Sequence, residues 1–434
     1  MRKAHRKMLR LTAWLLVGAA GGALGVGARE LIVWLGRLLH GGAAAAEWGA
    51  LDWWWILGPL AAGGLLVGLI SRYDWELISG AGLDDTLECY HRDGARQRPW
   101  DAPLKLTASL GGLASGISGG LMGPATYAGL GLGSWVARWW GFGEDRVKTL
   151  GLCGIAAALS AISGAPLGSA LFTTEVLFLR HLEYRRFFPV LLSALTAHLL
   201  TRATGFYRPL FEFSLVDDLY PRWDLIGGLW VTLAVGLLTA ALLTLAVRAV
   251  ERFHERLSVP RWLRPALGAL AGGLLVVLFV PELAGQVLSL GAAEIQTMNA
   301  AVPMPLRLAL LLLLFKTLCV VLSVGSGASV GLLAPSIYLG SLAGVLAANL
   351  FNIADQPLFV AAGVTVVLVT ITNAPLAAAV MMVEVFGPSV LIPVTIAGLV
   401  GNLASRRLVV YHSILTWRGE VELVAKPPGE DDED

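Results

Sequence analysis

Two five-residue stretches decide the fold: GLMGP at residues 120–124 and GLLAP at residues 331–335. In each, a glycine stands four positions before a proline, inside a long run without charged residues. Proline in the first turn of a helix forfeits no hydrogen bond, because that N–H has no partner there. Both stretches therefore predict helices that begin inside an apolar region, with free N–H groups and positive dipole ends directed into a cavity. Two such starts facing each other would form an anion site without a buried lysine or arginine.

A second motif repeats at a similar distance. The letters APL occur at residues 165–167 and again at 374–376, and a glutamate stands nine positions after each proline, at Glu175 and Glu384. Two motifs in the same order predict that the chain consists of two related halves. Weak internal symmetry of this kind is typical of membrane transport proteins.

The composition places these motifs in a membrane. Of the 434 residues, 56% are hydrophobic and 15% charged, against about 25% charged in soluble domains. Uncharged stretches such as 106–137 and 317–354 are longer than the roughly 18 apolar residues that indicate a membrane span. This predicts a multi-pass membrane protein and excludes a soluble enzyme, a nucleic-acid binder and a disulfide-stapled domain. Neither a metal-ligand spacing nor a nucleophile–base pair occurs, so we expect no cofactor, no metal and no enzymatic activity.

Charge also predicts the orientation and the domain organisation. Five of the first ten residues are basic, and basic residues beside spans mark the cytoplasmic side. We expect a cytoplasmic tail at 1–8, a transmembrane domain at 9–415 with repeats at about 50–205 and 222–405, and a short acidic cytoplasmic tail at 416–434 without a regulatory domain. Both termini would then face the cytoplasm from the cell membrane, which in bacteria is the inner membrane.

Together these motifs resemble those of the CLC family of chloride channels and proton-coupled anion exchangers, over about residues 60–415. GAGLD at 80–84 corresponds to that family's first pore segment, and GLMGP and GLLAP correspond to the next two. The resemblance implies an all-α membrane protein of two inverted-topology repeats with tilted and broken helices, forming a homodimer with one pore per subunit. It also implies an anion path lined by these residues: Ala81, Gly82, Met122, Gly123, Leu332, Leu333 and Tyr411.

At four positions the chain departs from the family pattern in ways that bear on mechanism. Met122 stands in the place of the gating glutamate, and Val176 in the place of the second proton-carrying glutamate of exchangers. Ala81 replaces an anion-contacting serine, and Asp84 replaces a proline. Proton coupling requires titratable groups along the path. We therefore expect passive transport of small inorganic anions of the chloride type, uncoupled from protons, with Met122 at the gate position.

Alternatives remain open for the gate, the coupling and the anion. Met122 leaves an open pore, forms an apolar steric gate, or packs in a protein that has lost transport and serves as a membrane scaffold. An exchanger with a relocated proton path is the second hypothesis, with Glu175, beside Val176, as the first candidate carrier. The transported anion is chloride, fluoride, nitrate, bicarbonate or another small anion.

Three further residues have two interpretations each. Tyr411 either donates its hydroxyl to an anion at the inner mouth or is an interfacial tyrosine. Asp84 either caps the N-terminus of a helix or weakens anion binding at that helix end. Glu384 is expected to orient a neighbouring helix or loop rather than to take part in transport.

Overall fold

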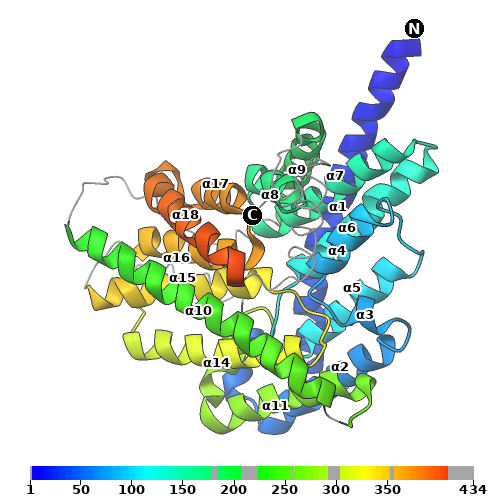
Figure 1. Ribbon diagram of the computed structural model, residues 1–434. Coiled ribbons are helices and arrows are strands. Elements are labelled where there is room, and N and C mark those ends of the chain that lie inside the picture. Colours follow the sequence, from blue (N-terminus) through cyan, green and yellow to red (C-terminus); the bar gives the residue numbers. More distant parts are fainter. Residues whose placement is uncertain are drawn as a thin grey trace, which may run out of the picture.

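The computed structural model describes residues 2–177, 184–206, 223–256, 258–291, 304–351 and 356–408, which are almost entirely helical (Figure 1). The first half contains α1 (Arg2–Leu39), α2 (Trp53–Ile70), α3 (Trp75–Ile78), α4 (Leu83–His91), α5 (Asp101–Ala114), α6 (Met122–Trp139), α7 (Glu144–Ser163), α8 (Pro166–Val176) and α9 (Tyr184–Ala203). The second half contains α10 (Trp223–Arg256), α11 (Arg264–Phe279), α12 (Ala284–Val287), α14 (Leu306–Gly325), α15 (Leu333–Leu350), α16 (Gln356–Thr372), α17 (Pro375–Phe386) and α18 (Leu391–Leu408). Short 3-10 turns are η1 (Ala45–Ala50), η2 (Arg261–Leu263), η3 (Pro281–Leu283) and η4 (Pro388–Val390). Tyr411 and the acidic tail at 416–434 lie outside the described residues.

The helices have the length and composition of membrane spans. Among the described residues, eight helices are long and apolar enough to cross a bilayer, and α7 and α15 are buried along most of their length. Around them, large apolar side chains such as Leu278 and Ile392, 70% and 71% exposed, cover the outer surface. Such a surface is stable when it faces lipid rather than water. The predicted all-α, multi-pass fold is confirmed.

Glycines bring two pairs of helices into close contact. A Cβ on Gly129 of α6 would lie 2.5 Å from the carbonyl oxygen of Gly154 in α7. In the second half, a Cβ on Gly340 of α15 would lie 2.6 Å from the carbonyl oxygen of Gly363 in α16. Small residues let membrane helices approach until their backbones touch. The pairs α6–α7 and α15–α16 therefore pack in the same way in the two halves.

The two halves meet at the glycines of the repeated motif. Gly120 and Gly331 form an antiparallel bridge, in which the N–H of Gly120 donates to the carbonyl of Gly331 at 2.8 Å and the reverse bond is 2.7 Å. Just beyond this bridge, α6 and α15 begin, and both have 18 residues. The bridge therefore fixes the starts of the two helices side by side, in the interior of the protein.

Candidate anion-binding site

Both helix starts predicted from the repeated motif are present in the structure. Met122 is the first residue of α6 and Leu333 the first of α15, so each helix begins two residues after its motif glycine. Pro124 and Pro335 thus occupy the first turns, where a missing N–H removes no helical hydrogen bond. The glycines stay outside the helices, and their small size permits the bridge between Gly120 and Gly331.

The two helix ends present unpaired backbone donors. Neither α6 nor α15 has a side-chain hydrogen bond at its N-cap, Leu121 or Leu332, and neither has an acid in its first turn. Each helix end carries roughly half a positive elementary charge through its dipole. Two such ends lie side by side at one backbone bridge, and helix N-termini are the kind of structure that binds an anion without a cationic side chain.

A third backbone segment closes on the same place. Gly82, the N-cap of α4, has a φ of 86°, which favours glycine. A Cβ on Gly82 would lie 2.5 Å from the carbonyl carbon of Gly123, and a Cβ on Gly123 would lie 1.8 Å from the carbonyl oxygen of Ala81. The segment that precedes α15 also contacts Gly123, because a Cβ on Gly331 would lie 2.9 Å from the amide nitrogen of Gly123. The segments around residues 81, 122 and 332, which are far apart in the sequence, therefore converge at Gly123.

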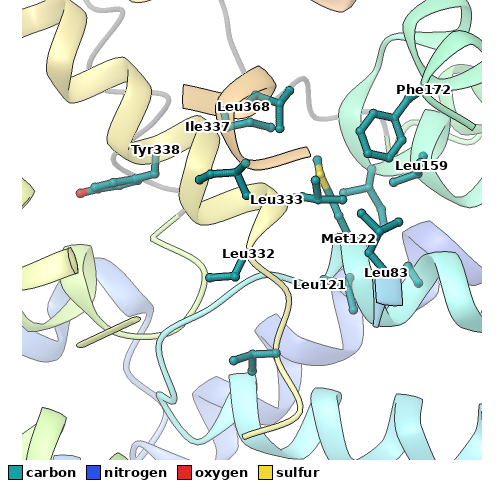
Figure 2. Packing of buried hydrophobic residues seen from close by; sticks show 14 of the residues in the cluster. Leu83, Leu121, Met122, Leu159, Phe172, Leu332, Leu333, Ile337, Tyr338 and Leu368 are labelled. Carbon is teal, nitrogen blue, oxygen red and sulfur yellow. The ribbon is translucent and has the colours of Figure 1, made fainter. Parts of the chain in front are cut away.

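The side chains at this convergence are apolar. Met122 is 3% exposed and Leu333 2% exposed, and both belong to the large buried core. Figure 2 shows them with buried apolar side chains from several helices: Leu83 from α4, Leu159 from α7, Phe172 from α8, Ile337 from α15 and Leu368 from α16, with Leu121 preceding α6 and Leu332 preceding α15. The position predicted to be the gate thus holds a thioether packed in an apolar setting.

Two buried lysines lie on the helices that precede α6 and α15 in the chain. Lys105 in α5 and Lys316 in α14 are both fully buried, and each stands fifteen residues before its motif glycine. Lys105 forms an ion pair with Asp85 at 2.7 Å and donates to the carbonyls of Leu77 and Gly80. Sequence reasoning overlooked Lys105, although its spacing from the motif, equal to that of Lys316, was a usable signal.

Lys316 has a different set of partners. Its Nζ donates to the carbonyls of Val287 at 2.8 Å and Ser289 at 3.0 Å, and it lies 5.4 Å from the ring centroid of Tyr338. Ser289 in turn accepts from the N–H of Gly119 at 3.2 Å. The second lysine is therefore connected through one loop to the approach segment of α6.

The acids of the second motif contact helix starts rather than the convergence at Gly123. The Glu175 carboxylate accepts the N–H groups of Leu376 and Ala377 at 3.0 and 2.6 Å. Glu384 accepts those of residues 167 and 168 at 2.8 and 2.6 Å, which agrees with the orienting role expected for it. Val176, 1% exposed, ends α8 and offers no titratable group.

The N-cap role considered for Asp84 is wrong. The N-cap of α4 is Gly82, and Asp84 lies in the first turn of the helix. Gly82 adopts the left-handed backbone that this turn needs, so the helix begins directly after Gly82. Asp84 therefore lies too late in the sequence to be the N-cap. An acid in the first turn still interacts favourably with the helix dipole.

Comparisons with known proteins identify proteins similar in sequence and in fold. A chloride channel of Escherichia coli O81 (strain ED1a), named voltage-gated ClC-type chloride channel ClcB, is 30% identical over 417 residues, which cover 93% of this chain and 91% of that protein. The crystal structure of a CLC-type fluoride/proton antiporter superposes with a TM-score of 0.79 at 21% identity, covering 94% of this chain and 97% of that one. A slow cyanobacterial Cl⁻/H⁺ antiporter superposes with a TM-score of 0.76 at 19% identity, covering 96% and 98%.

The structural similarity shows the shared fold, and a sequence comparison identifies the family. The model of the voltage gated chloride channel family matches residues 62–406, which is more than half of the chain and includes all three converging segments. The chain therefore belongs to the voltage-gated chloride channel family.

Proposed function

We propose that the protein passively transports small inorganic anions of the chloride type, uncoupled from protons, through a pore in each subunit of a homodimer. We place it in the cell (inner) membrane, with both termini cytoplasmic. The observation that carries this proposal is the meeting of the α6 and α15 starts at the bridge between Gly120 and Gly331, with Met122 in place of an acid. An anion there would be bound by the backbone N–H groups of residues 122–123 and 332–333, beside Ala81 and Gly82, with Tyr411 as the expected side-chain donor at the inner mouth.

Backbone dipoles suit transport because they bind weakly. A desolvated cation in contact with the anion would hold it too tightly for release, whereas two helix ends attract it without a full charge. Lys105 and Lys316 do not contradict this, because their ammonium groups are engaged by carbonyl oxygens and, for Lys105, by Asp85. Their hydrogen bonds support the surrounding loops.

The absence of coupling rests on the two substituted positions. Met122 and Val176 cannot bind a proton, and Glu175, the first candidate for a relocated path, already accepts two backbone hydrogen bonds. Those two bonds tie the Glu175 carboxylate to the start of α17 rather than to the anion path. The contrary hypothesis, proton antiport, is favoured by the antiporters among the similar folds.

The burial of Met122 supports a steric gate over an open pore. With 3% of its surface exposed, the side chain fills space between apolar neighbours, as Figure 2 shows. A constriction of this kind blocks ions by excluding water and opens when the flexible thioether changes rotamer.

Fluoride is a second candidate for the transported anion, alongside chloride. The similarity of fold to a fluoride/proton antiporter favours it, as does the replacement of the anion-contacting serine by Ala81, which leaves a site formed chiefly by backbone donors. Nitrate and bicarbonate are planar and larger, and they belong in the same comparison.

Efflux from liposomes tests the proposal. Vesicles loaded with chloride, fluoride, nitrate or bicarbonate and containing the purified protein should release one or more of these anions when valinomycin removes the electrical barrier, with no matching proton uptake. Proton uptake in fixed stoichiometry with the anion would establish antiport instead. Protein-free vesicles provide the leak rate, and no efflux above that rate for any anion would refute anion transport.

A further inference from the structure

Two buried threonines join the helix starts of α4 and α6, and we propose that Thr86 and Thr126 are positioning residues that set the anion selectivity of the site. This inference rests on the proposed function, because it concerns the same site. Both hydroxyls are hidden from solvent: Thr86 is 1% exposed and Thr126 is fully buried. Their Oγ1 atoms lie 3.1 Å apart, one on each helix.

Each hydroxyl also contacts a carbonyl of the site. Thr86 Oγ1 lies 2.6 Å from the carbonyl oxygen of Gly82, and Thr126 Oγ1 lies 2.6 Å from that of Gly123. Gly82 and Gly123 are the two residues at which the first and second pore segments touch. The chain of contacts Gly82–Thr86–Thr126–Gly123 therefore connects the two backbones by a second route, beside their direct contact.

The three contacts share only two hydroxyl protons. If both threonines donate to their carbonyls, the 3.1 Å contact between the hydroxyl oxygens has no proton; if one donates to the other, one carbonyl loses that donor. In the first arrangement the two oxygens are in van der Waals contact, and in the second a hydrogen bond joins them. In either arrangement, moving one hydroxyl therefore displaces the other. The pair thus couples the orientation of Gly82 to that of Gly123.

Selectivity follows from this coupling because the site is formed by backbone atoms. The peptide units at Gly82 and Gly123 carry both N–H groups that would face an anion and carbonyls that would repel it. Hydroxyls bonded to the carbonyls hold those oxygens in place and thereby fix the spacing of the donors. A shift of a few tenths of an ångström changes which anion radius fits, so a compact ion and a larger one respond differently.

A buried threonine on another helix serves as a control for the effect of removing a hydroxyl alone. Thr232 in α10 is fully buried, and its hydroxyl donates to the carbonyl of Gly228 at 2.9 Å, four residues earlier on its own helix. It therefore resembles Thr86 in burial and in bonding back along its helix. Within the part of the chain that the structure describes, it differs from Thr86 because its hydroxyl does not contact a second hydroxyl on another helix. Thr232→Val measures the cost of removing a buried hydroxyl elsewhere.

Two ratios test the inference. The first is the ratio of the chloride efflux rate to the fluoride efflux rate from liposomes. The second is the ratio of the chloride and fluoride dissociation constants, measured by titrating the purified protein with each sodium salt. Thr86→Val and Thr126→Val should each change both ratios by about fivefold, the factor that corresponds to one ordinary hydrogen bond. Thr86→Ser and Thr126→Ser should restore the wild-type ratios, and Thr232→Val should leave them unchanged. Because the hydroxyls depend on each other, the double valine variant should change the ratios by less than the two single effects combined.

Wild-type ratios in the folded valine variants would overturn the inference, as would an equal change in Thr232→Val. Thermal unfolding identifies variants that fail to fold, and Thr86→Ala and Thr126→Ala replace a valine variant that does. Wild-type protein without efflux of any anion refutes the proposed function, whereas efflux with unaltered selectivity in the valine variants refutes only the threonine role. The binding ratio decides the threonine question even when efflux is absent.

Discussion

Glu175 and Glu384 each hold the first turn of the other's helix, across the boundary between the two halves of the chain. Glu175, near the end of α8, accepts two N–H groups at the start of α17, and Glu384, near the end of α17, accepts two at the start of α8. A carboxylate at a helix N-terminus satisfies unpaired donors and interacts with the positive end of the dipole. The two acids therefore join α8 and α17 as a reciprocal pair.

Neutralising either acid should affect stability and leave transport unchanged. Glu175→Gln and Glu384→Gln keep the shape of the side chain and one acceptor oxygen but remove the charge. We expect each to lower the free energy of unfolding by about 1–2 kcal/mol, because hydrogen bonds to a charged group are weakened. Thermal unfolding in detergent and anion efflux measure the two effects. If Glu175→Gln alone abolished proton movement, with Glu384→Gln as the matched control, Glu175 would be a proton carrier and the exchanger hypothesis would be restored.

An acid at the gate position should make efflux depend on pH. In Met122→Glu, the ionised carboxylate competes with the anion for the helix ends, so efflux is blocked at high pH and rises as the pH falls through the pKa of the new glutamate. Met122→Gln has nearly the same shape without the charge and should show no such dependence. Efflux measured between pH 4 and 8 checks both variants. Identical pH profiles in the two would place residue 122 away from the anion path.

Shortening the same side chain tests the steric gate. Met122→Ala should raise the rate of anion efflux, because it removes the thioether that fills the constriction. The matched control is Met382→Ala in α17, where the methionine is equally buried, at 1% exposure against 3%. Both substitutions should destabilise the protein by about 2–5 kcal/mol through the cavity they create. An unchanged or lower efflux rate in folded Met122→Ala would mean that the constriction lies elsewhere.

The repeated motifs predicted the helix starts because proline and glycine act locally. GLMGP and GLLAP specify where α6 and α15 begin, whatever surrounds them, and the structure confirms both starts. The sequence analysis considered two helix starts that face each other, but it did not predict the backbone bridge between Gly120 and Gly331 that the structure shows. The limit of local reasoning appears at Asp84, where a left-handed glycine two residues earlier takes the cap position.

Partners that are distant in the sequence could not be predicted in this way. Glu175 and Glu384 can each bind the start of the other's helix only because α8 and α17 lie side by side. No residue type in the sequence predicts that contact. The contact between Thr86 and Thr126 likewise needs the packing of α4 on α6. Tyr411 lies outside the described residues, so its role stays a prediction.

The ion pair of Lys105 and Asp85 should protect the proposed anion site from a negative charge. Lys105 Nζ lies 2.7 Å from Asp85 and 3.4 Å from the carbonyl of Gly80, the residue before Ala81. Removing the lysine leaves a carboxylate without its counter-charge beside the first pore segment, and that charge repels an anion. Lys105→Met should therefore weaken chloride binding by about tenfold, the effect of one unit charge at roughly 10 Å with an effective dielectric constant of about 20.

A second substitution distinguishes this electrostatic effect from damage to the loop. Lys105→Met combined with Asp85→Asn removes both charges, so chloride affinity should return to within about twofold of wild type if the unpaired carboxylate is the cause. Lys316→Met is the comparison, since among the described residues its lysine bonds only to carbonyls, and its loss should lower stability without a charge that neutralisation can rescue. Chloride titration and thermal unfolding of the four proteins give the result. A double variant as weak as Lys105→Met alone would assign Lys105 to holding the Leu77 and Gly80 carbonyls, because those two bonds are lost in both variants.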